Sequence, residues 1–450
     1  MSESAVQSNS PEIASTVPSK TNAIFPLLFS GLVLGVGWAI RGVFGHEWGA
    51  AWAGSMGCLA VIVAANREDW LKKAPILASV GAVGWGLGGM MSYGLVIGYC
   101  RGVDFGNVFY GYTMLSIIGG LYGFVGGGLF GLGLESGGEK KAAWHSLIVE
   151  MFVVGFLVYV VLVDFMELRM TPPRSDNWAR CLGAAIALAW FLHRGGFHRA
   201  LRVAAYGGLG GGFGFAFGNL IQTLGTVIGI PINMWNVMEF TLGFFGGVGM
   251  AYAVLTRDWP ESETPSKTLN WLGIGFFAVL LPLANRLAAM KTEHFAPTAE
   301  RLGIADVQGF VDSQLSTATL TWLAFSTMVV LFWWWSQRRD GFSLKVGIAI
   351  LLAIHSIHYA SLGAIKTSIL YTPFELTNTR LWYFPILFMI TCLWIVFGRR
   401  EISLPALSPV RETEKRWMTI LIGLLALFAV FALISISSHN EPLNNAQVRF

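Results

Sequence analysis

The sequence predicts an all-α protein that crosses a membrane many times. Of its 450 residues, 54% are hydrophobic and only 12% are charged, and the mean hydropathy is +0.59. Soluble proteins carry about 25% charged residues, so this chain lacks the polar residues to cover its surface in water. Its apolar residues also form long unbroken runs, whereas a transmembrane β-barrel would alternate them with polar ones. The composition therefore excludes a secreted disulfide scaffold, a disordered chain and an ordinary cytosolic enzyme.

Apolar runs of about 20 residues, the length that crosses a bilayer, predict about thirteen spans. Four of the runs are short, so the number lies between twelve and fourteen. The predicted spans are 24–40, 49–65, 74–100, 105–134, 142–166, 178–192, 203–230, 233–255, 268–288, 316–335, 346–370, 381–397 and 417–436. Residues 1–23 are expected to form a disordered cytoplasmic tail, 289–315 an external loop with one amphipathic helix, and 437–450 an external C-terminal tail.

Lys and Arg residues in the loops predict the orientation, because positive charge is enriched on the cytoplasmic side. With thirteen spans, nineteen of these residues fall on the side of the N-terminus and ten on the other, while Lys366 lies inside a span. The bias predicts a protein of the cytoplasmic (inner) membrane with its N-terminus inside and its C-terminus outside. The positive charge marks topology, so membrane lipid is an expected partner and nucleic acid is not; a homo-oligomer is left open.

Glycine divides the chain into two regions. The sequence has 54 glycines, and 45 of them precede residue 251. This predicts a closely packed Gly-rich core of eight helices over 24–255 and an aromatic-rich region of five over 268–436, because small residues let helices approach each other in lipid. The alternative is that glycines line a path or break helices, and 207–218 is dense enough that we expect a break there. Similar glycine spacing in 79–99 and 205–225 suggests a parallel internal repeat, although such stretches also align by chance.

A cluster of polar residues joins the first two spans. A continuous helix over 24–65 would be about 63 Å long, twice a bilayer, so the chain must turn near Gly42 and Gly45. Arg41, His46 and Glu47 lie at this turn between aromatic residues. They form either a polar turn capped by its own charges or a site for an anion or a proton.

Further ionisable residues lie inside spans, where each charge costs roughly 2.5 to 3.5 kcal/mol. Glu150 lies in the fifth span, and Asn236 and Glu239 lie near the start of the eighth, where a structural hydrogen-bond network is the alternative. The eleventh span holds His355 and His358, which are adjacent on the helix, and Lys366, which lies on nearly the same face as His355. The histidines are structural, contact a proton or substrate, or bind a metal or haem. No Cys or carboxylate in that helix completes a ligand set, so no metal or other cofactor is predicted.

Together these residues predict a secondary, proton-linked transporter of a small polar or anionic solute, with no catalytic residues. The predicted solute contacts are Arg41, His46, Glu47, Asn236, Glu239 and Lys366, and the predicted proton-coupling residues are Glu150, Glu239, His355 and His358. One alternative is a membrane-embedded enzyme acting on a lipid-linked or acyl substrate, which a lateral groove beside His46 would favour. Another is a channel or a membrane subunit of a larger complex. Convergence of the polar residues on one cavity would favour the transporter.

Overall fold

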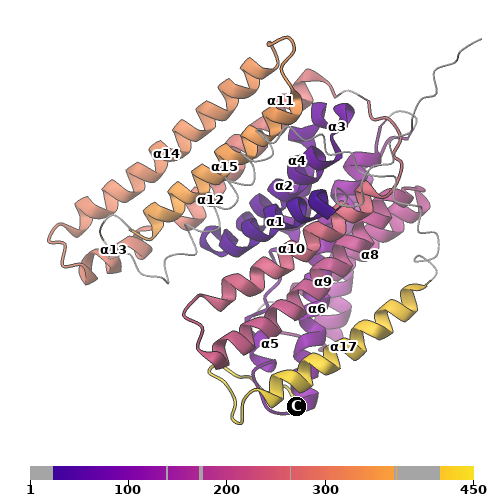
Figure 1. The fold of residues 1–450 in the computed structure, drawn as a ribbon, viewed down its shortest axis with the longest axis vertical. Coiled ribbons are helices and arrows are strands. Elements are labelled where there is room, and N and C mark those ends of the chain that lie inside the picture. The colour runs from indigo at the N-terminus through magenta and orange to yellow at the C-terminus, as the bar shows by residue number, and fades with distance from the viewer. Residues whose placement is uncertain (1–23, 138–139, 172–175, 264, 369–370, 372–415) are drawn as a thin grey trace, which may run out of the picture.

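The computed structural model describes residues 24–137, 140–171, 176–263, 265–368, 371 and 416–450, and these form helices joined by short connections (Figure 1). In this part of the chain, nine helical segments are long and apolar enough to cross a membrane. The protein is therefore a polytopic α-helical membrane protein, and its spans are in contact with lipid. The number thirteen is not confirmed, and the predicted span 381–397 lies outside the described residues.

The helices form two groups that follow each other in the chain. The first group is α1 (Ile24–Arg41), η2 (Gly42–Phe44), α2 (His46–Ala65), α3 (Glu68–Lys72), α4 (Ala74–Gly88), α5 (Gly94–Tyr99), α6 (Phe105–Glu135), α7 (Trp144–Tyr159), η3 (Val160–Phe165), α8 (Trp178–Arg194), α9 (His198–Ile228) and α10 (Met234–Leu255). The second group is α11 (Lys267–Ile274), η4 (Gly275–Leu280), α12 (Leu281–Ala289), α13 (Thr292–Arg301), α14 (Val307–Ser336) and α15 (Leu344–Lys366). A last helix, α17 (Trp417–Ser437), packs against α6 and α9 of the first group.

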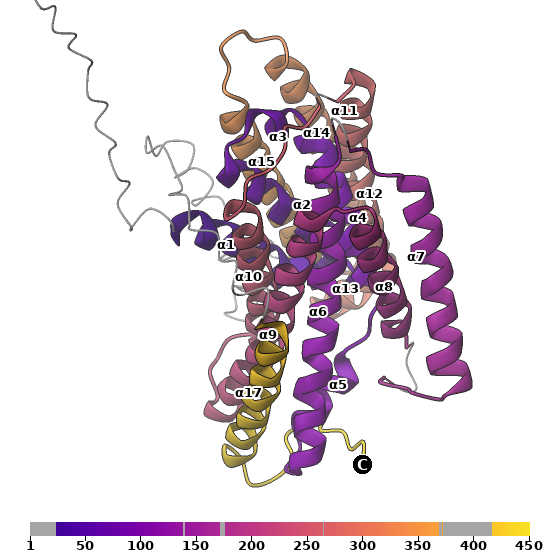
Figure 2. The ribbon, with the colours of Figure 1, turned by 90° about the vertical axis from the view of Figure 1, so that its right-hand side faces the viewer.

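The centre of the molecule is a bundle in which α9 lies between α6 and α10, and α1 covers α10 (Figures 1 and 2). Glycines let these backbones touch. A Cβ atom on Gly123 of α6 would overlap the carbonyl oxygen of Gly207 on α9, and one on Gly210 would overlap that of Phe245 on α10. The expected break at 207–218 is wrong, because α9 is continuous. A helix satisfies its own backbone hydrogen bonds, and close neighbours on both faces support this one.

The break lies instead in the segment 74–100, where a single helix is expected. Helix α4 ends at Gly88, and α5 begins only at Gly94. Glycines favour the end of a helix here, and a Cβ on Gly88 would overlap the ring of Tyr122. Since 74–100 is interrupted and α9 is not, the predicted internal repeat is not confirmed.

The predicted turn between the first two spans is present. Helices α1 and α2 form an antiparallel hairpin in which a Cβ on Gly37 would lie 3.0 Å from the Cβ of Ala53. Gly45 ends the turn with φ +91°, a backbone conformation that residues other than glycine rarely adopt. The length argument made from the sequence therefore identifies both helices and the turn between them.

The second group lies along one side of the bundle, where α12 and α15 contact α2 and α11 contacts α4 (Figure 1). The predicted loop 289–315 does contain an amphipathic helix, α13, which buries Phe295 and Ala299. The predicted end of the loop at residue 315 is wrong, because α14 begins at Val307. The carboxylate of Asp306 accepts a hydrogen bond from the Gly309 amide (2.8 Å) and caps this helix nine residues earlier than the apolar run suggests.

The C-terminal tail is attached to the first group rather than extended into solvent. The amide of Leu443 donates to the Arg101 carbonyl (3.0 Å), and that of Gln447 donates to the Gly98 carbonyl (2.9 Å). These contacts place the tail beside α5, at the same side as the end of α17, whose Ser435 hydroxyl donates to the Cys100 carbonyl (3.2 Å). Which side of the membrane this is, and which membrane, stay predictions.

Candidate functional site

Three side chains from distant parts of the chain meet where the α1–α2 hairpin turns. Arg41, the last residue of α1, is fully buried, and its Nη2 donates to Glu239 Oε1 on α10 (3.1 Å). The same Nη2 contacts the hydroxyl of Tyr93, which lies in the break between α4 and α5. The Tyr93 hydroxyl donates in turn to Glu239 Oε1 (2.7 Å). We call Arg41, Tyr93 and Glu239 the central triad.

Aromatic rings hold the arginine in place. The Arg41 guanidinium lies 4.5 Å from the centroid of the Trp38 ring, a cation–π contact that is stronger when water is excluded. Trp38 makes edge contacts with Trp85 (5.6 Å between centroids) and Tyr122 (4.8 Å). The wall behind the guanidinium is therefore rigid, and its position is set by α1, α4 and α6 together.

The central triad lies deep in the bundle. Tyr93 packs edge-on against Phe215 of α9, with 5.0 Å between centroids. Phe215 is thirteen residues from the last residue of α9, Ile228, and seventeen from its first, His198. At 1.5 Å per residue these ends are about 20 and about 26 Å away, so the triad is near the middle of the longest helices.

One side of the central triad is accessible. His46 is exposed, and its Nδ1 and carbonyl oxygen each lie 3.4 Å from Arg41 Nη1. Gly42 is also exposed, and a Cβ on it would lie 3.7 Å from Glu239 Oε2. Within the described residues, the hydrogen bonds of Glu239 all use Oε1. Its other oxygen therefore points toward the accessible turn.

Unpaired polar groups lie at the same level on the neighbouring helices. Gly218 of α9 packs against Met238 of α10, so the turn of α9 that follows it lies beside the turn of α10 that holds Glu239. Buried polar atoms of Gln222 and Asn236 on these turns lack a hydrogen-bond partner in the part of the chain that is described, while Asn219 and Thr223 lie beside the Tyr112 hydroxyl of α6. A buried amide without a partner costs about 1–3 kcal/mol, which favours a water or a ligand as the missing partner.

Lys366 and Glu47 flank the turn without joining the triad. Lys366, at the end of α15, donates from Nζ to the Val43 carbonyl (2.6 Å) and so connects the second group to the hairpin turn. Glu47 is exposed in the first turn of α2. Arg41 thus contacts both His46 and Glu239, while Lys366 and Glu47 lie beside the turn.

The remaining predicted residues lie elsewhere. Glu150 on α7 forms an ion pair with Arg194 at the end of α8, where both side chains are partly exposed. His355 and His358 are buried among aromatic rings of the second group. His355 stacks on Phe277 (4.0 Å between centroids), and its Nδ1 donates to the Leu351 carbonyl (2.8 Å).

The second histidine stacks in the same way, since the His358 ring lies parallel to that of Phe325 (4.1 Å between centroids). Both its nitrogens lack a hydrogen-bond partner within the described residues. Nor do any three His, Cys, Asp or Glu side chains there come close enough together to hold a metal ion. The contacts of this histidine pair are those of aromatic packing.

Sequence reasoning missed Tyr93 and the role of Trp38. Tyr93 lies in a segment that the sequence predicts as one helix, so nothing distinguishes its hydroxyl from that of any interfacial tyrosine. The available signal is the run Gly88–Gly89 just before it, which ends α4. Trp38 lies one turn before Arg41, and this spacing is the signal for a stacked guanidinium.

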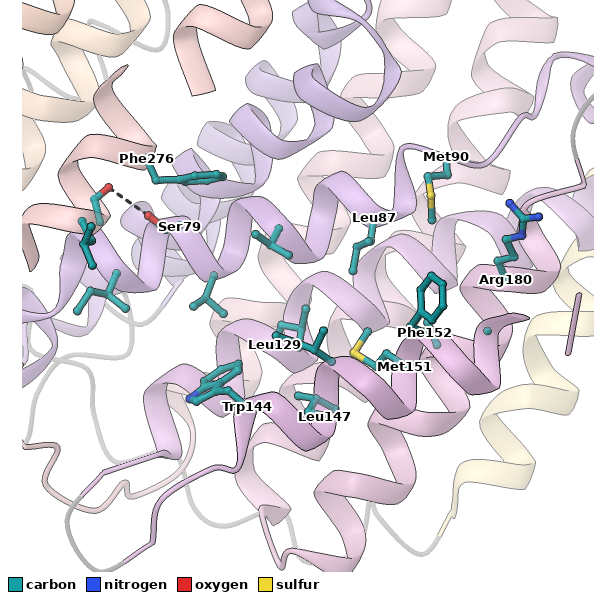
Figure 3. A pocket seen from close by; sticks show the side chains of 18 of the residues that line it. Ser79, Leu87, Met90, Leu129, Trp144, Leu147, Met151, Phe152, Arg180 and Phe276 are labelled. Carbon is teal, nitrogen blue, oxygen red and sulfur yellow. Dashed lines mark hydrogen bonds between the residues drawn. The ribbon is translucent and has the colours of Figure 1, made fainter. Parts of the chain in front are cut away.

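A second feature is a lateral cavity of about 870 Å³ between α4, α7, α8 and the α11–η4 segment (Figure 3). It is lined almost entirely by apolar side chains. Figure 3 shows Met90 and Arg180 at one end and Ser79 and Phe276 at the other. His46 and Glu47 are not among its lining residues.

The chain matches no family model, no curated protein and no solved structure.

Proposed function

We propose that the protein is a secondary transporter that exchanges or carries a small anionic solute together with a proton at the central triad. The observation that supports this most is the buried Arg41–Glu239 pair, in the middle of the bundle and with Glu239 Oε2 toward an accessible turn. Breaking a buried ion pair is costly, but such a pair adds little net stability over apolar residues. Its presence in a membrane core therefore favours a functional role.

The chemistry of the central triad suggests how a proton and an anion would be coupled. While Glu239 is ionised, it neutralises Arg41 and competes with any other anion. A proton on Glu239 removes that competition, so the solute anion takes the place of the carboxylate beside the guanidinium. The Tyr93 hydroxyl, which donates to Glu239 Oε1, can donate to the solute instead. Binding of the solute then adds no net charge to the site, because one proton binds for each negative charge of the anion.

The surrounding backbone supports an alternating-access site. The triad lies at two interruptions, the hairpin turn Gly42–Phe44 and the break between α4 and α5. Transporters of known type often place their solutes at such discontinuous helices near the membrane midplane. Lys366 binds the turn from α15, so a shift of the second group would move the accessible side of the triad.

The enzyme alternative is less well supported. It would require a lateral groove beside His46 and Glu47, and the lateral cavity is instead lined by other residues on the far side of α4. The proposal also assigns the proton to Glu239, and it gives no step to Glu150, His355 or His358. The variants Glu150→Gln and His358→Phe test two of these predicted proton-coupling roles.

The test is proton movement in liposomes that contain the purified full-length protein and an internal pH-sensitive dye. A panel of small carboxylates and inorganic phosphate is added outside at pH 6, where we expect at least one anion to acidify the lumen. Glu239→Gln should reduce this flux to the level of empty liposomes, since the amide cannot carry the proton. Glu150→Gln, a carboxylate removed from a partly exposed ion pair, is the matched control and should keep the flux.

The variant Arg41→Lys distinguishes the positive charge of residue 41 from the planar shape of its guanidinium. Lysine keeps the positive charge but loses the planar fork that binds Glu239 or the solute anion that replaces it, so the apparent affinity should fall more than the maximal rate. An equal flux in wild type and Glu239→Gln would contradict the proposal. A flux lost in Glu150→Gln but kept in Glu239→Gln would move the proton site to α7.

A further inference from the structure

The lateral cavity lies on the surface that faces lipid. Helix α7 stands at the margin of the molecule and packs chiefly on α8 (Figure 2), and Leu129 of α6 lines the space between α7 and α4. Apart from His145 near its start, the exposed side chains of α7 are apolar, as in Val149, which is 60% exposed. A volume of about 870 Å³ is within the range of ligand pockets, roughly 300–1,000 Å³.

A positive charge marks one end of this cavity. The Arg180 guanidinium lies 4.2 Å from the centroid of the Tyr159 ring, which holds it at the mouth of the cavity (Figure 3). No carboxylate within the described residues forms an ion pair with it. The acid nearest in sequence, Asp176, uses Oδ1 to accept from the Met170 amide (2.8 Å) and the Trp178 indole (3.1 Å). The charge of Arg180 therefore lacks a protein counter-ion in this part of the chain.

The length of the cavity matches one lipid chain. Trp144 and Phe156 both line it and lie twelve residues apart on α7, a rise of about 18 Å. Half the hydrocarbon core of a bilayer is about 15 Å thick. An acyl chain whose head group is at Arg180 would thus extend along most of the cavity.

We infer that the lateral cavity binds one acyl chain of an anionic phospholipid from the surrounding bilayer, with the lipid phosphate on Arg180. The apolar walls provide contact for the chain, and the unpaired guanidinium selects the negative head group. This site is separate from the central triad, so it stands or falls independently of the proposed transport.

The experiment is native mass spectrometry of the full-length protein in detergent, with phosphatidylglycerol or phosphatidylcholine of identical chains added in titration. Wild type should bind the first phosphatidylglycerol about fivefold more tightly than phosphatidylcholine, as expected for one cation near a membrane surface. Arg180→Gln should remove this preference. Arg301→Gln, an exposed arginine at the end of α13, is the matched control and should keep it.

A second variant tests the chain rather than the head group. Val83 lines the cavity and is 47% exposed, so Val83→Trp fills the space without disturbing a buried neighbour. It should weaken the first binding step for both lipids by fivefold or more. Equal binding of the two lipids by wild type, or a preference that survives in Arg180→Gln, would overturn the assignment of the head group. Unchanged binding in Val83→Trp would overturn the assignment of the cavity.

Discussion

The first and second groups of helices use different contacts to pack in lipid. In the first group, glycines bring backbones together, as where Gly123 of α6 meets Gly207 of α9. In the second group, side chains fill the space between helices, and a Cβ on Gly275 or Gly341 would find nothing within 4 Å. Gly273 of this group does meet another helix closely, because it packs on Pro75 of α4. Glycine in this protein thus marks contact with the first group rather than helix packing in general.

The two groups also differ in how they hold buried polar residues. The central triad is a closed set of hydrogen bonds between three segments of the first group. His355 and His358 of the second group are held by phenylalanine rings, with few hydrogen bonds. A rigid backbone fixes charges at a defined distance, which a solute site needs, whereas ring packing fixes only shape.

The largest expected effect comes from breaking the central triad. Arg41→Gln leaves the Glu239 carboxylate buried without its partner, and we expect a loss of roughly 3–5 kcal/mol in the free energy of unfolding. The double variant Arg41→Gln/Glu239→Gln should recover much of this loss, because two amides can bond to each other. Chemical denaturation in detergent measures both. Losses that simply add in the double variant would show that the pair is not coupled.

The next effect tests the glycine contacts. Gly123→Ala places a methyl group against the backbone of Gly207, and overpacking of this kind costs about 1–3 kcal/mol. Gly275→Ala, at an open position of the second group, is the matched control. Its free energy of unfolding should stay within about 1 kcal/mol of wild type, in the stabilising direction. Similar destabilisation in both variants would remove the distinction between the groups.

A smaller effect of opposite sign is expected in the second group. His358→Phe keeps the stacked ring on Phe325 and removes two buried nitrogens that lack partners in the described part of the chain. We expect stabilisation by about 1 kcal/mol, with proton flux in liposomes unchanged. A stable variant without flux would instead give His358 the proton-coupling role predicted from the sequence.

The smallest effect concerns the connection between the two groups. Asp69 of α3 accepts from Arg67 (2.7 Å) and from the Ser262 amide (2.9 Å) in the linker between α10 and α11. Partial burial raises the pKa of Asp69, but the hydrogen bonds from Arg67 and Ser262 outweigh it and leave the pKa below its usual value. The stabilisation is therefore present above about pH 4, the pKa of an unfolded Asp, and is lost as the pH falls through the lower folded pKa.

Hydrogen exchange at the Ser262 amide measures this connection. Asp69→Asn should raise exchange at pH 6 by less than about fivefold, since a partly exposed ion pair contributes at most about 1 kcal/mol. The difference from wild type should shrink at pH 3. Glu68→Gln, which removes an exposed pair with Lys72, is the control and should leave Ser262 unchanged. A difference that persists undiminished at pH 3 would rule out the carboxylate as the cause.

Much of the candidate site could be predicted because a charge in an apolar run needs a reason. That rule selects Arg41 and Glu239, and it equally selects Glu150, which the structure places in a partly exposed ion pair. It passes over Tyr93, whose hydroxyl is not costly in a sequence. The rule identifies charged residues, and it does not identify their partners.

The sequence by itself determined the membrane class and the α1–α2 hairpin. The low fraction of charged residues shows that lipid surrounds the protein, and the length of an apolar run shows how often it can cross the bilayer. Only the tertiary structure decided that α9 is continuous, that the segment after Gly88 is not, and that Arg41 meets a carboxylate 198 residues away. The physical reason is that these features depend on which helices touch. In lipid, which helices touch depends on how the shapes and backbones of distant segments fit together, and the local sequence pattern of one segment does not contain that information.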